Sequence, residues 1–275
     1  LESEGKKIIH LEVGEPDYLP PVSVKNELSK TFEKKRVHYT QTTGVPILRK
    51  SIAKKRSVKE ENVIVTPGAR FAVFSAMVST LSVGDEVIIS EPAWPAYRDC
   101  ANFIGIKVKA VKTKVHQNWD LDLDQLEQMI TPNTKMIVLN SPNNPTGKIV
   151  RQQQIDTVLA LAGKNDIYVL SDEVYSMYSY VPYKSILDFE YNKSIMVSSF
   201  SKSHAMTGFT VGYAISNKGT IDKISKIQAM AITSVAEPMQ YAAVAALNAD
   251  VTKNKILMKK RLDFIRKQLE NLPCE

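Results

Sequence analysis

Five short apolar runs, rich in β-branched residues, recur along the 275-residue chain: residues 63–65, 87–89, 136–139, 167–170 and 195–197. Continuous runs of this kind fit strands that are buried on both faces of a parallel sheet. The stretches between them predict helices over residues 69–81, 94–104, 122–130 and 150–164. Strands and helices in this alternation predict an α/β fold, a mostly parallel sheet sandwiched by helices.

Polar residues follow the end of each apolar run. The clusters are Thr66-Pro67-Gly68, Ser90-Glu91-Pro92, Asn140-Ser141-Pro142, Ser171-Asp172-Glu173 and Ser198-Ser199. Any one of them also suits an ordinary turn. Together they would meet at the carboxyl edge of a parallel sheet, which is where ligands bind in open α/β folds. We therefore expect the functional site at this edge.

Several classes of protein are disfavoured. The net charge is +7, but the basic residues are dispersed and no nucleic-acid-reading motif accompanies them, so we expect no nucleic-acid partner. No apolar run approaches about 18 residues and no secretory signal is evident, which predicts no membrane association and a cytoplasmic location. Phosphate-loop, dinucleotide, nucleophile-elbow and zinc-protease motifs are absent from the sequence, and the four histidines lack metal-ligand spacing.

One lysine stands among hydroxyl residues just after a predicted buried strand. Lys202 is flanked by Ser199 and Ser201, and a desolvated lysine at a ligand edge can form a Schiff base with an aldehyde. Asp172 ends the preceding predicted strand, and Tyr175 follows it. A carboxylate there could keep a pyridine nitrogen protonated, and a phenol could donate to a phenolate oxygen. These are the requirements of pyridoxal 5'-phosphate, although Asp172 taken alone would equally suit a helix cap.

Three longer motifs carry a family resemblance. The sequence from Asn140 to Gly147, the sequence from Ser171 to Tyr175, and Ser199-Phe200-Ser201-Lys202 with Gly208 and Gly212-Tyr213 resemble the signatures of class I/II aminotransferases. These are fold-type I pyridoxal-phosphate enzymes, and the order and spacing also match. The resemblance implies an aminotransferase that moves an amino group between an amino acid and a 2-oxo acid through a Schiff base on Lys202.

The resemblance also implies roles for individual residues. Lys202 would hold the cofactor aldehyde and then move a proton, Asp172 would pair with the pyridine nitrogen, and Tyr175 would contact the phenolate oxygen. Further cofactor contacts are implied for Asn144, for Trp94 stacked on the ring, for the backbone of Gly68, Ala69 and Arg70 at the phosphate, and for the hydroxyls of Ser199 and Ser201.

The implied assembly is a homodimer with shared sites. Tyr39 resembles the tyrosine that reaches the phosphate in the partner subunit, although a lone tyrosine is more often a packing residue. Gly14 and Asn144 match positions that lie near the substrate. Trp94 taken alone would likewise suit the core or the surface.

Two departures from the family pattern affect these expectations. Thr210 stands where the family usually has an arginine that clamps the phosphate, which predicts weaker cofactor binding unless Arg70 or another cation compensates. The family's substrate arginine belongs to a C-terminal small domain that the sequence largely lacks. We expect an N-terminal segment at 1–20, a large cofactor-binding domain at 21–250, and the start of that small domain at 251–275.

Two other functions stay open. A C–S lyase would use the same lysine and carboxylate, because substrate orientation decides between transfer and elimination. A non-catalytic aminotransferase-like regulatory domain is the alternative from another class, which Thr210 favours and Lys202 disfavours.

Overall fold

A seven-stranded sheet forms the centre of the molecule, in the order β1-β7-β6-β5-β4-β2-β3. The computed structural model describes residues 2–9, 13–270 and 272. All strands run parallel except β7, which is antiparallel to both of its neighbours. The strands are β1 (Val63–Thr66), β2 (Glu86–Glu91), β3 (Lys107–Lys112), β4 (Thr134–Asn140), β5 (Tyr168–Asp172), β6 (Ser194–Ser199) and β7 (Gly212–Ile215).

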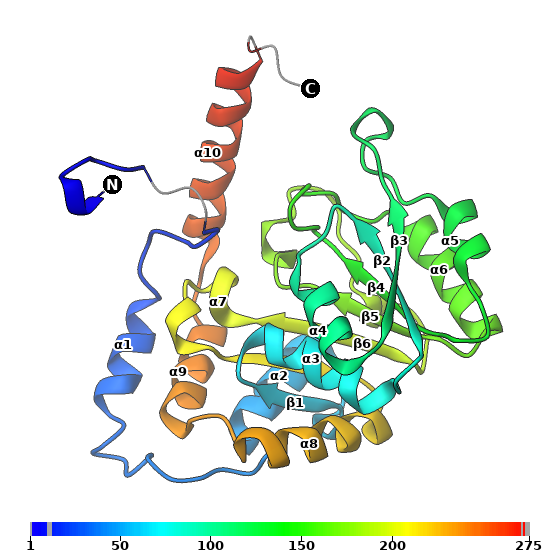
Figure 1. Cartoon of the computed structure of the whole chain (residues 1–275). Helices are drawn as coiled ribbons and strands as arrows, with labels where there is room; N and C mark the ends of the chain where they lie inside the picture. Colours follow the sequence, from blue (N-terminus) through cyan, green and yellow to red (C-terminus); the bar gives the residue numbers. More distant parts are fainter. Residues whose placement is uncertain (1, 10–12, 271, 273–275) are drawn as a thin grey trace.

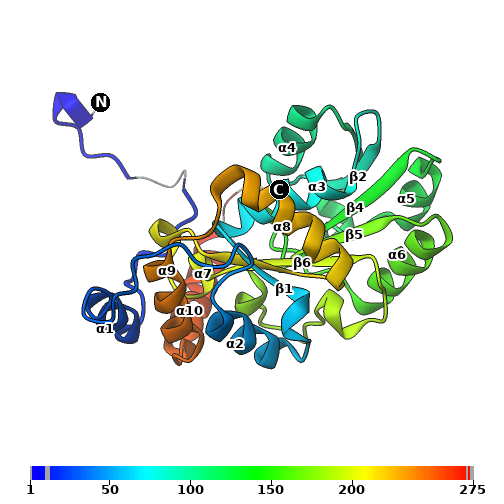
Figure 2. The same cartoon turned by 90° about the horizontal axis from the view of Figure 1, so that it is seen from below.

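Helices cover both faces of this sheet (Figures 1 and 2). On one face α3 (Gly68–Thr80), α4 (Ala96–Ile104) and α8 (Lys218–Ile232) enclose one apolar core. On the other face α2 (Pro46–Arg56), α5 (Leu123–Met129), α6 (Gln152–Lys164) and α9 (Glu237–Leu247) enclose a second. Neighbouring residues of one strand serve opposite cores, as Ile64 and Val65 do, because side chains alternate along a strand. The predicted α/β sandwich is therefore confirmed.

Strands β3 and β7 were not predicted from the sequence. Strand β3 carries Lys107, Lys109 and Lys112 between its apolar residues, which breaks the continuous apolar pattern. It lies at the edge of the sheet, where lysines disfavour pairing with another chain. Strand β7 has only four residues and begins with a glycine. The five predicted strands and four predicted helices are all present, with ends shifted by up to two residues.

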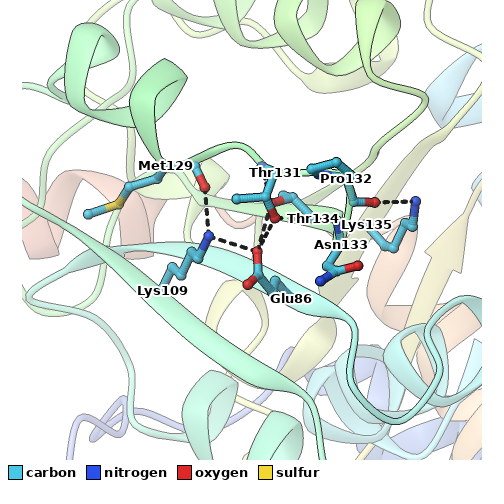
Figure 3. A network of polar contacts seen from close by, with 8 residues as sticks. All are labelled: Glu86, Lys109, Met129, Thr131, Pro132, Asn133, Thr134 and Lys135. Carbon is cyan, nitrogen blue, oxygen red and sulfur yellow. Dashed lines mark hydrogen bonds and ion pairs between the residues drawn. The ribbon is translucent and has the colours of Figure 1, made fainter.

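A polar network ties β2, β3 and β4 together at their amino ends (Figure 3). Oε2 of Glu86 accepts hydrogen bonds from Thr131 (2.5 Å) and Thr134 (3.2 Å) and lies 2.7 Å from Nζ of Lys109. Burial opposes ionisation of Glu86, but the hydrogen bonds from Lys109 and the threonines outweigh it and lower its pKa. This network lies at the edge opposite the predicted site, so its role is to hold the strands.

Helix α10 (Thr252–Leu269) projects from the body of the molecule, and none of its residues is buried (Figure 1). The remaining α-helices are α1 (Val22–Ser29) and α7 (Phe200–Ser203). No helix within the described ranges is both long and apolar enough to cross a membrane. Residues 1, 10–12, 271 and 273–275 lie outside the description, so the predicted outer segments at 1–20 and 251–275 are covered only in part. The predicted domain boundaries stay predictions.

Candidate active site

The antiparallel strand β7 joins the two parts of the chain that were predicted to hold a phosphate. Gly212, its first residue, pairs with Thr66 at the carboxyl end of β1 and with Ser199 at the carboxyl end of β6. A Cβ atom on Gly212 would lie 2.6 Å from the carbonyl carbon of Gly68 and 2.8 Å from the nitrogen of Ala69. Glycine at this position therefore lets the start of α3 pack directly on β7.

The start of helix α3 at this point has the backbone geometry that suits an anion. Gly68 has φ of +76°, a conformation that L side chains rarely adopt, and no side chain caps the helix start. The free backbone N–H groups of a first helical turn attract anions. Ser199 is buried and Ser201 is half-buried in the segment that follows β6. Thr210 lies two residues before Gly212, is exposed, and has φ of +48°.

Asp172 is the buried carboxylate of the predicted site. It ends β5, is 4% exposed, and accepts hydrogen bonds from the Tyr97 hydroxyl (2.7 Å) and from the Val174 N–H (3.1 Å). Burial raises its pKa, and these two bonds partly offset the effect. Among the described residues no lysine or arginine forms an ion pair with it. A buried carboxylate without a cation is costly, and a bound cationic group would relieve that cost.

The aromatic wall beside Asp172 comes from α4 and the residues before it. Trp94 packs edge-on against Tyr97, with ring centroids 5.4 Å apart and an interplanar angle of 88°. The guanidinium carbon of Arg70 lies 4.8 Å from the centroid of the Trp94 ring. Trp94 thus links Arg70, from the first turn of α3, to the Tyr97–Asp172 pair.

Asn144 and Tyr175 are brought together by hydrogen bonds at the ends of β4 and β5. Asn140 donates through Nδ2 to the carbonyl of Asp172 (3.0 Å), and its Oδ1 accepts from the N–H of Asn144 (2.7 Å). Burial and the charge of Asp172 raise the pKa of Tyr175, whereas a hydrogen bond with Asn144 lowers it. The three predicted residues Asn144, Asp172 and Tyr175 therefore share one neighbourhood.

Lys202 lies on the short helix α7, and its side chain is half-buried. Its Nζ donates a hydrogen bond to the carbonyl of Gly14, so these two predicted residues are in contact. Burial lowers the pKa of Lys202, and the negative charge of Glu15 opposes this effect. The Lys202 carbonyl accepts a 2.8 Å hydrogen bond from the Tyr178 hydroxyl, which fixes the backbone that carries the amine.

The segment around Gly14 is itself held in place from two sides. Thr207 donates to the carboxylate of Glu15, and the hydroxyls of Tyr18 and Tyr178 are 2.5 Å apart. Both guanidinium nitrogens Nη1 and Nη2 of Arg261 on α10 bind the carboxylate of Asp17, at 2.7 and 3.0 Å. The N-terminal segment therefore contacts Lys202 and connects it to α10.

Tyr39 is the predicted site residue that stands apart. It lies on the segment between α1 and α2, and its side chain is 88% exposed. The neighbouring His38 N–H donates to Glu237 of α9 at 2.9 Å, so the backbone there is anchored. Within the described part of the chain Tyr39 makes no hydrogen bond with another predicted site residue.

Tyr97 and Tyr178 are polar residues of the site that the sequence did not reveal. Tyr97 follows Trp94 by three residues, which is about one turn within the helix predicted over residues 94–104, and this spacing is the available signal. The Tyr178 hydroxyl contacts the backbone carbonyl of Lys202, and no spacing in the sequence indicates such a contact.

Comparison with known proteins places the chain in a family. The sequence model of the family "Aminotransferase class I and II" matches residues 6–274. The chain belongs to this family. An aspartate aminotransferase of Thermotoga maritima is 35% identical, in an alignment that covers 99% of this chain and 74% of the relative. A (5-formylfuran-3-yl)methyl phosphate transaminase of Methanocaldococcus jannaschii is 34% identical, with coverage of 97% and 71%.

Solved structures of the family share the fold. The crystal structure of the Thermotoga maritima aspartate aminotransferase superimposes with a TM-score of 0.95 at 33% identity and covers 100% of this chain and 76% of that one. Membership makes this chain a class I and II aminotransferase with the large-domain fold of the family. Members of the family use pyridoxal phosphate, and the residues at the carboxyl edge suit that cofactor. The unpaired buried carboxylate of Asp172, the desolvated amine of Lys202 and the uncapped start of α3 are the features that fit it.

Proposed function

We propose that this chain is a pyridoxal-phosphate-dependent aminotransferase that moves an amino group between an amino acid and a 2-oxo acid. The observation that carries the proposal is the carboxyl edge itself, where a buried carboxylate without a cation and a desolvated lysine amine occur together. A non-catalytic domain would not need either feature, and each one costs folding stability.

The proposal assigns the cofactor to described residues. The amine of Lys202 would hold its aldehyde, Asp172 its pyridine nitrogen, and Asn144 with Tyr175 its phenolate oxygen. Trp94 would cover the ring, and the N–H groups at the start of α3 with the Ser199 and Ser201 hydroxyls would take the phosphate. When bound, the cofactor supplies an electron-withdrawing ring that stabilises negative charge on the substrate carbon bearing the amino group.

The protein's own residues provide orientation and proton transfer. Because burial lowers the pKa of Lys202, its amine is more readily neutral at physiological pH than that of an exposed lysine and can accept a proton at Nζ. Tyr178 fixes the backbone from which that amine reaches the substrate. Tyr97 and the Val174 N–H hold the Asp172 carboxylate in one orientation. The carbonyl of Gly14 accepts a hydrogen bond from the amine and so orients it.

The cofactor assignment is tested by borohydride reduction and mass spectrometry. Protein incubated with pyridoxal phosphate and reduced should carry a phosphopyridoxyl adduct on Lys202. The Lys202→Ala variant should lack it, and Lys184→Ala, which removes an exposed lysine, should keep it. A wild-type protein that remains unmodified and shows no absorbance between about 360 and 430 nm would contradict the proposal.

The reaction is tested with a panel of amino donors and 2-oxoglutarate as acceptor. Transfer yields glutamate without free ammonia, whereas a C–S lyase releases ammonia and a 2-oxo acid from a sulfur-containing donor. The proposal expects glutamate. Release of ammonia without formation of glutamate would contradict the proposal and favour a C–S lyase.

We also propose a cytoplasmic homodimer with shared sites. The support is Tyr39, whose exposed side chain on an anchored backbone is available to a second subunit. Size-exclusion chromatography with light scattering should give twice the chain mass of 30.8 kDa. Tyr39→Phe should weaken cofactor binding without changing that mass.

A further inference from the structure

A cavity of about 550 Å³ lies on the face of the sheet opposite α3 and α4. Its walls include Lys55 and Arg56 at the end of α2, Val174 after β5, and His204 after α7. Asp172 and Glu173 are neighbours in the chain, and their side chains point to opposite faces of the sheet. Asp172 bonds to Tyr97 of α4, whereas Glu173 bonds to Ser185 and to the Ile186 N–H on the other side. The cavity lies on the opposite side of the sheet from Tyr97, and it adjoins the proposed cofactor site at Ser199, which lines its wall.

Arg56 presents a guanidinium to this cavity without an ion pair. Its Nε and Nη2 donate to the Tyr213 hydroxyl at 3.3 and 3.0 Å, and no described carboxylate lies within 4.0 Å of it. Glu173, the enclosed acidic residue nearby in the fold, is fully buried, and its Oε1 already accepts from Ser171, Ser185 and Ile186. The charge of Glu173 acts on Arg56 at longer range, but no described carboxylate forms an ion pair with the guanidinium.

Lys55 adds a second cation to the same wall. Its Nζ donates to the carbonyl of Leu247 at 3.2 Å. Burial and the neighbouring charge of Arg56 lower the pKa of Lys55, so the two cations repel one another in a partly desolvated place. An anion between them would remove that repulsion.

The rest of the wall mixes polar side chains with apolar ones such as Met177 and Leu247. His204 is 6% exposed, its Nδ1 is 2.7 Å from the Ser203 hydroxyl, and its Nε2 has no partner among the described residues. Asp188 is a carboxylate on the wall, and its Oδ2 accepts from the Ser185 N–H at 3.0 Å. An enclosed ring nitrogen of this kind lacks the hydrogen-bond partner that buried polar groups normally have.

We propose that this cavity binds a small metabolite that carries an oxyanion, a carboxylate or a phosphate group, through the free guanidinium edge of Arg56 assisted by Lys55. The planar guanidinium matches both groups through two parallel hydrogen bonds. The volume lies within the usual range for small-molecule sites, about 300–1,000 Å³. Ser203 and His204 follow Lys202 directly, so a ligand in the cavity contacts the segment that carries the proposed catalytic lysine.

The test is isothermal titration calorimetry on the full chain with two probes, inorganic phosphate and succinate. Arg56→Gln should weaken binding of at least one probe by about tenfold or more, because a charge-assisted, two-point contact is lost. Lys54→Gln removes the same charge from the adjacent exposed position and should change binding less than about twofold. Dependence on Arg56 for phosphate alone identifies a phosphate ligand, and dependence for succinate alone identifies a carboxylate.

Two further variants separate binding from folding. Arg56→Lys retains the charge but not the planar fork, and we expect affinity between those of the wild type and Arg56→Gln. Should Arg56→Gln fail to fold, Lys55→Gln takes its place and should weaken the same probe by about threefold or more. The proposal is overturned when neither probe binds the wild type, or when both bind all folded variants equally.

Discussion

The phenol of Tyr97 donates a 2.7 Å hydrogen bond to Oδ2 of Asp172 and so joins helix α4 to the end of strand β5. The other carboxylate oxygen accepts the Val174 N–H at 3.1 Å. Both oxygens of Asp172 are thus oriented, yet no described cation neutralises the group. The arrangement favours a ligand that brings a positive charge and costs stability while none is bound.

Replacing Asp172 by Asn should therefore stabilise the cofactor-free protein. We expect a gain of about 1–2 kcal/mol in the free energy of unfolding at pH 7, measured with urea, because a buried charge becomes a neutral amide of the same shape. The same variant should bind pyridoxal phosphate about tenfold more weakly or worse. Asp156→Asn, at an exposed position of α6, is the control and should change neither quantity.

The stabilisation of Asp172→Asn should depend on pH with a defined sign. Because burial raises the pKa of Asp172, the folded state binds its proton more tightly than the unfolded state. Wild-type stability should therefore decline as pH rises from the ordinary carboxyl pKa, about 3.9, through the raised one. The Asn variant should lack this contribution, and identical pH profiles would contradict the assignment.

Gly212→Ala should lower both stability and phosphate affinity. The added Cβ would meet backbone atoms of Gly68, Ala69 and Ser198 at 2.6, 2.8 and 2.9 Å, and backbone cannot move aside cheaply. A loss of about 1–3 kcal/mol in the free energy of unfolding is expected. Gly208→Ala is the matched control, because nothing lies within 4 Å of the Cβ it would add.

The phosphate end of the proposed site can be separated from the ring by comparing pyridoxal phosphate with pyridoxal. If the α3 start is displaced in Gly212→Ala, affinity for pyridoxal phosphate should fall more than affinity for pyridoxal. An equal loss of affinity for both compounds would contradict binding of the phosphate at the start of α3.

Thr210→Arg should tighten cofactor binding by restoring the arginine that the family resemblance predicts at this position. A charge-assisted phosphate contact contributes roughly 1.5–3 kcal/mol, which corresponds to about a tenfold to 150-fold lower dissociation constant. Absorbance titration of the cofactor-free protein measures this change. Arg70→Gln should act in the opposite direction if Arg70 compensates for Thr210. If the wild type binds pyridoxal phosphate as tightly as Thr210→Arg does, the prediction that the wild type lacks an arginine contact to the phosphate is contradicted.

Acid should destabilise the protein through His204. Burial, with a smaller effect from Lys55, lowers the pKa of His204 to about 4, so the unfolded chain takes up this proton before the folded one does. The ordinary pKa of histidine, which applies to the unfolded chain, is about 6.5. The free energy of unfolding should therefore fall by about 2 kcal/mol between pH 7 and pH 5.

Urea unfolding at these two pH values provides the test for His204. His204→Asn, which keeps a polar group near Ser203, should be less sensitive to pH by about that amount. His116→Asn, at an exposed position, should behave like the wild type. A wild-type protein whose stability is the same at both pH values would exclude a buried neutral His204.

Continuous apolar runs made the buried strands predictable, because β1, β4, β5 and β6 have both faces covered. The edge strand β3 follows another rule, since solvent on one side lets lysines replace apolar residues. The site residues Asp172, Asn144 and Lys202 were found through motifs that lie at strand ends. Tyr97 and Arg56 were not, because their roles depend on which elements pack face to face, and spacing along the chain does not encode that.

Strand β7 runs against its neighbours, so Ser199 and Gly212, which bracket the lysine-bearing segment, lie opposite one another in the sheet. Residues 200–211 thus leave the sheet and return to it at one point. Phe200, Met206 and Val211 of this segment are buried in the apolar core, so the excursion is held at its ends and in its middle. The reversed strand thus closes a short, anchored loop, and the amine of Lys202 projects from a backbone that has little freedom to shift.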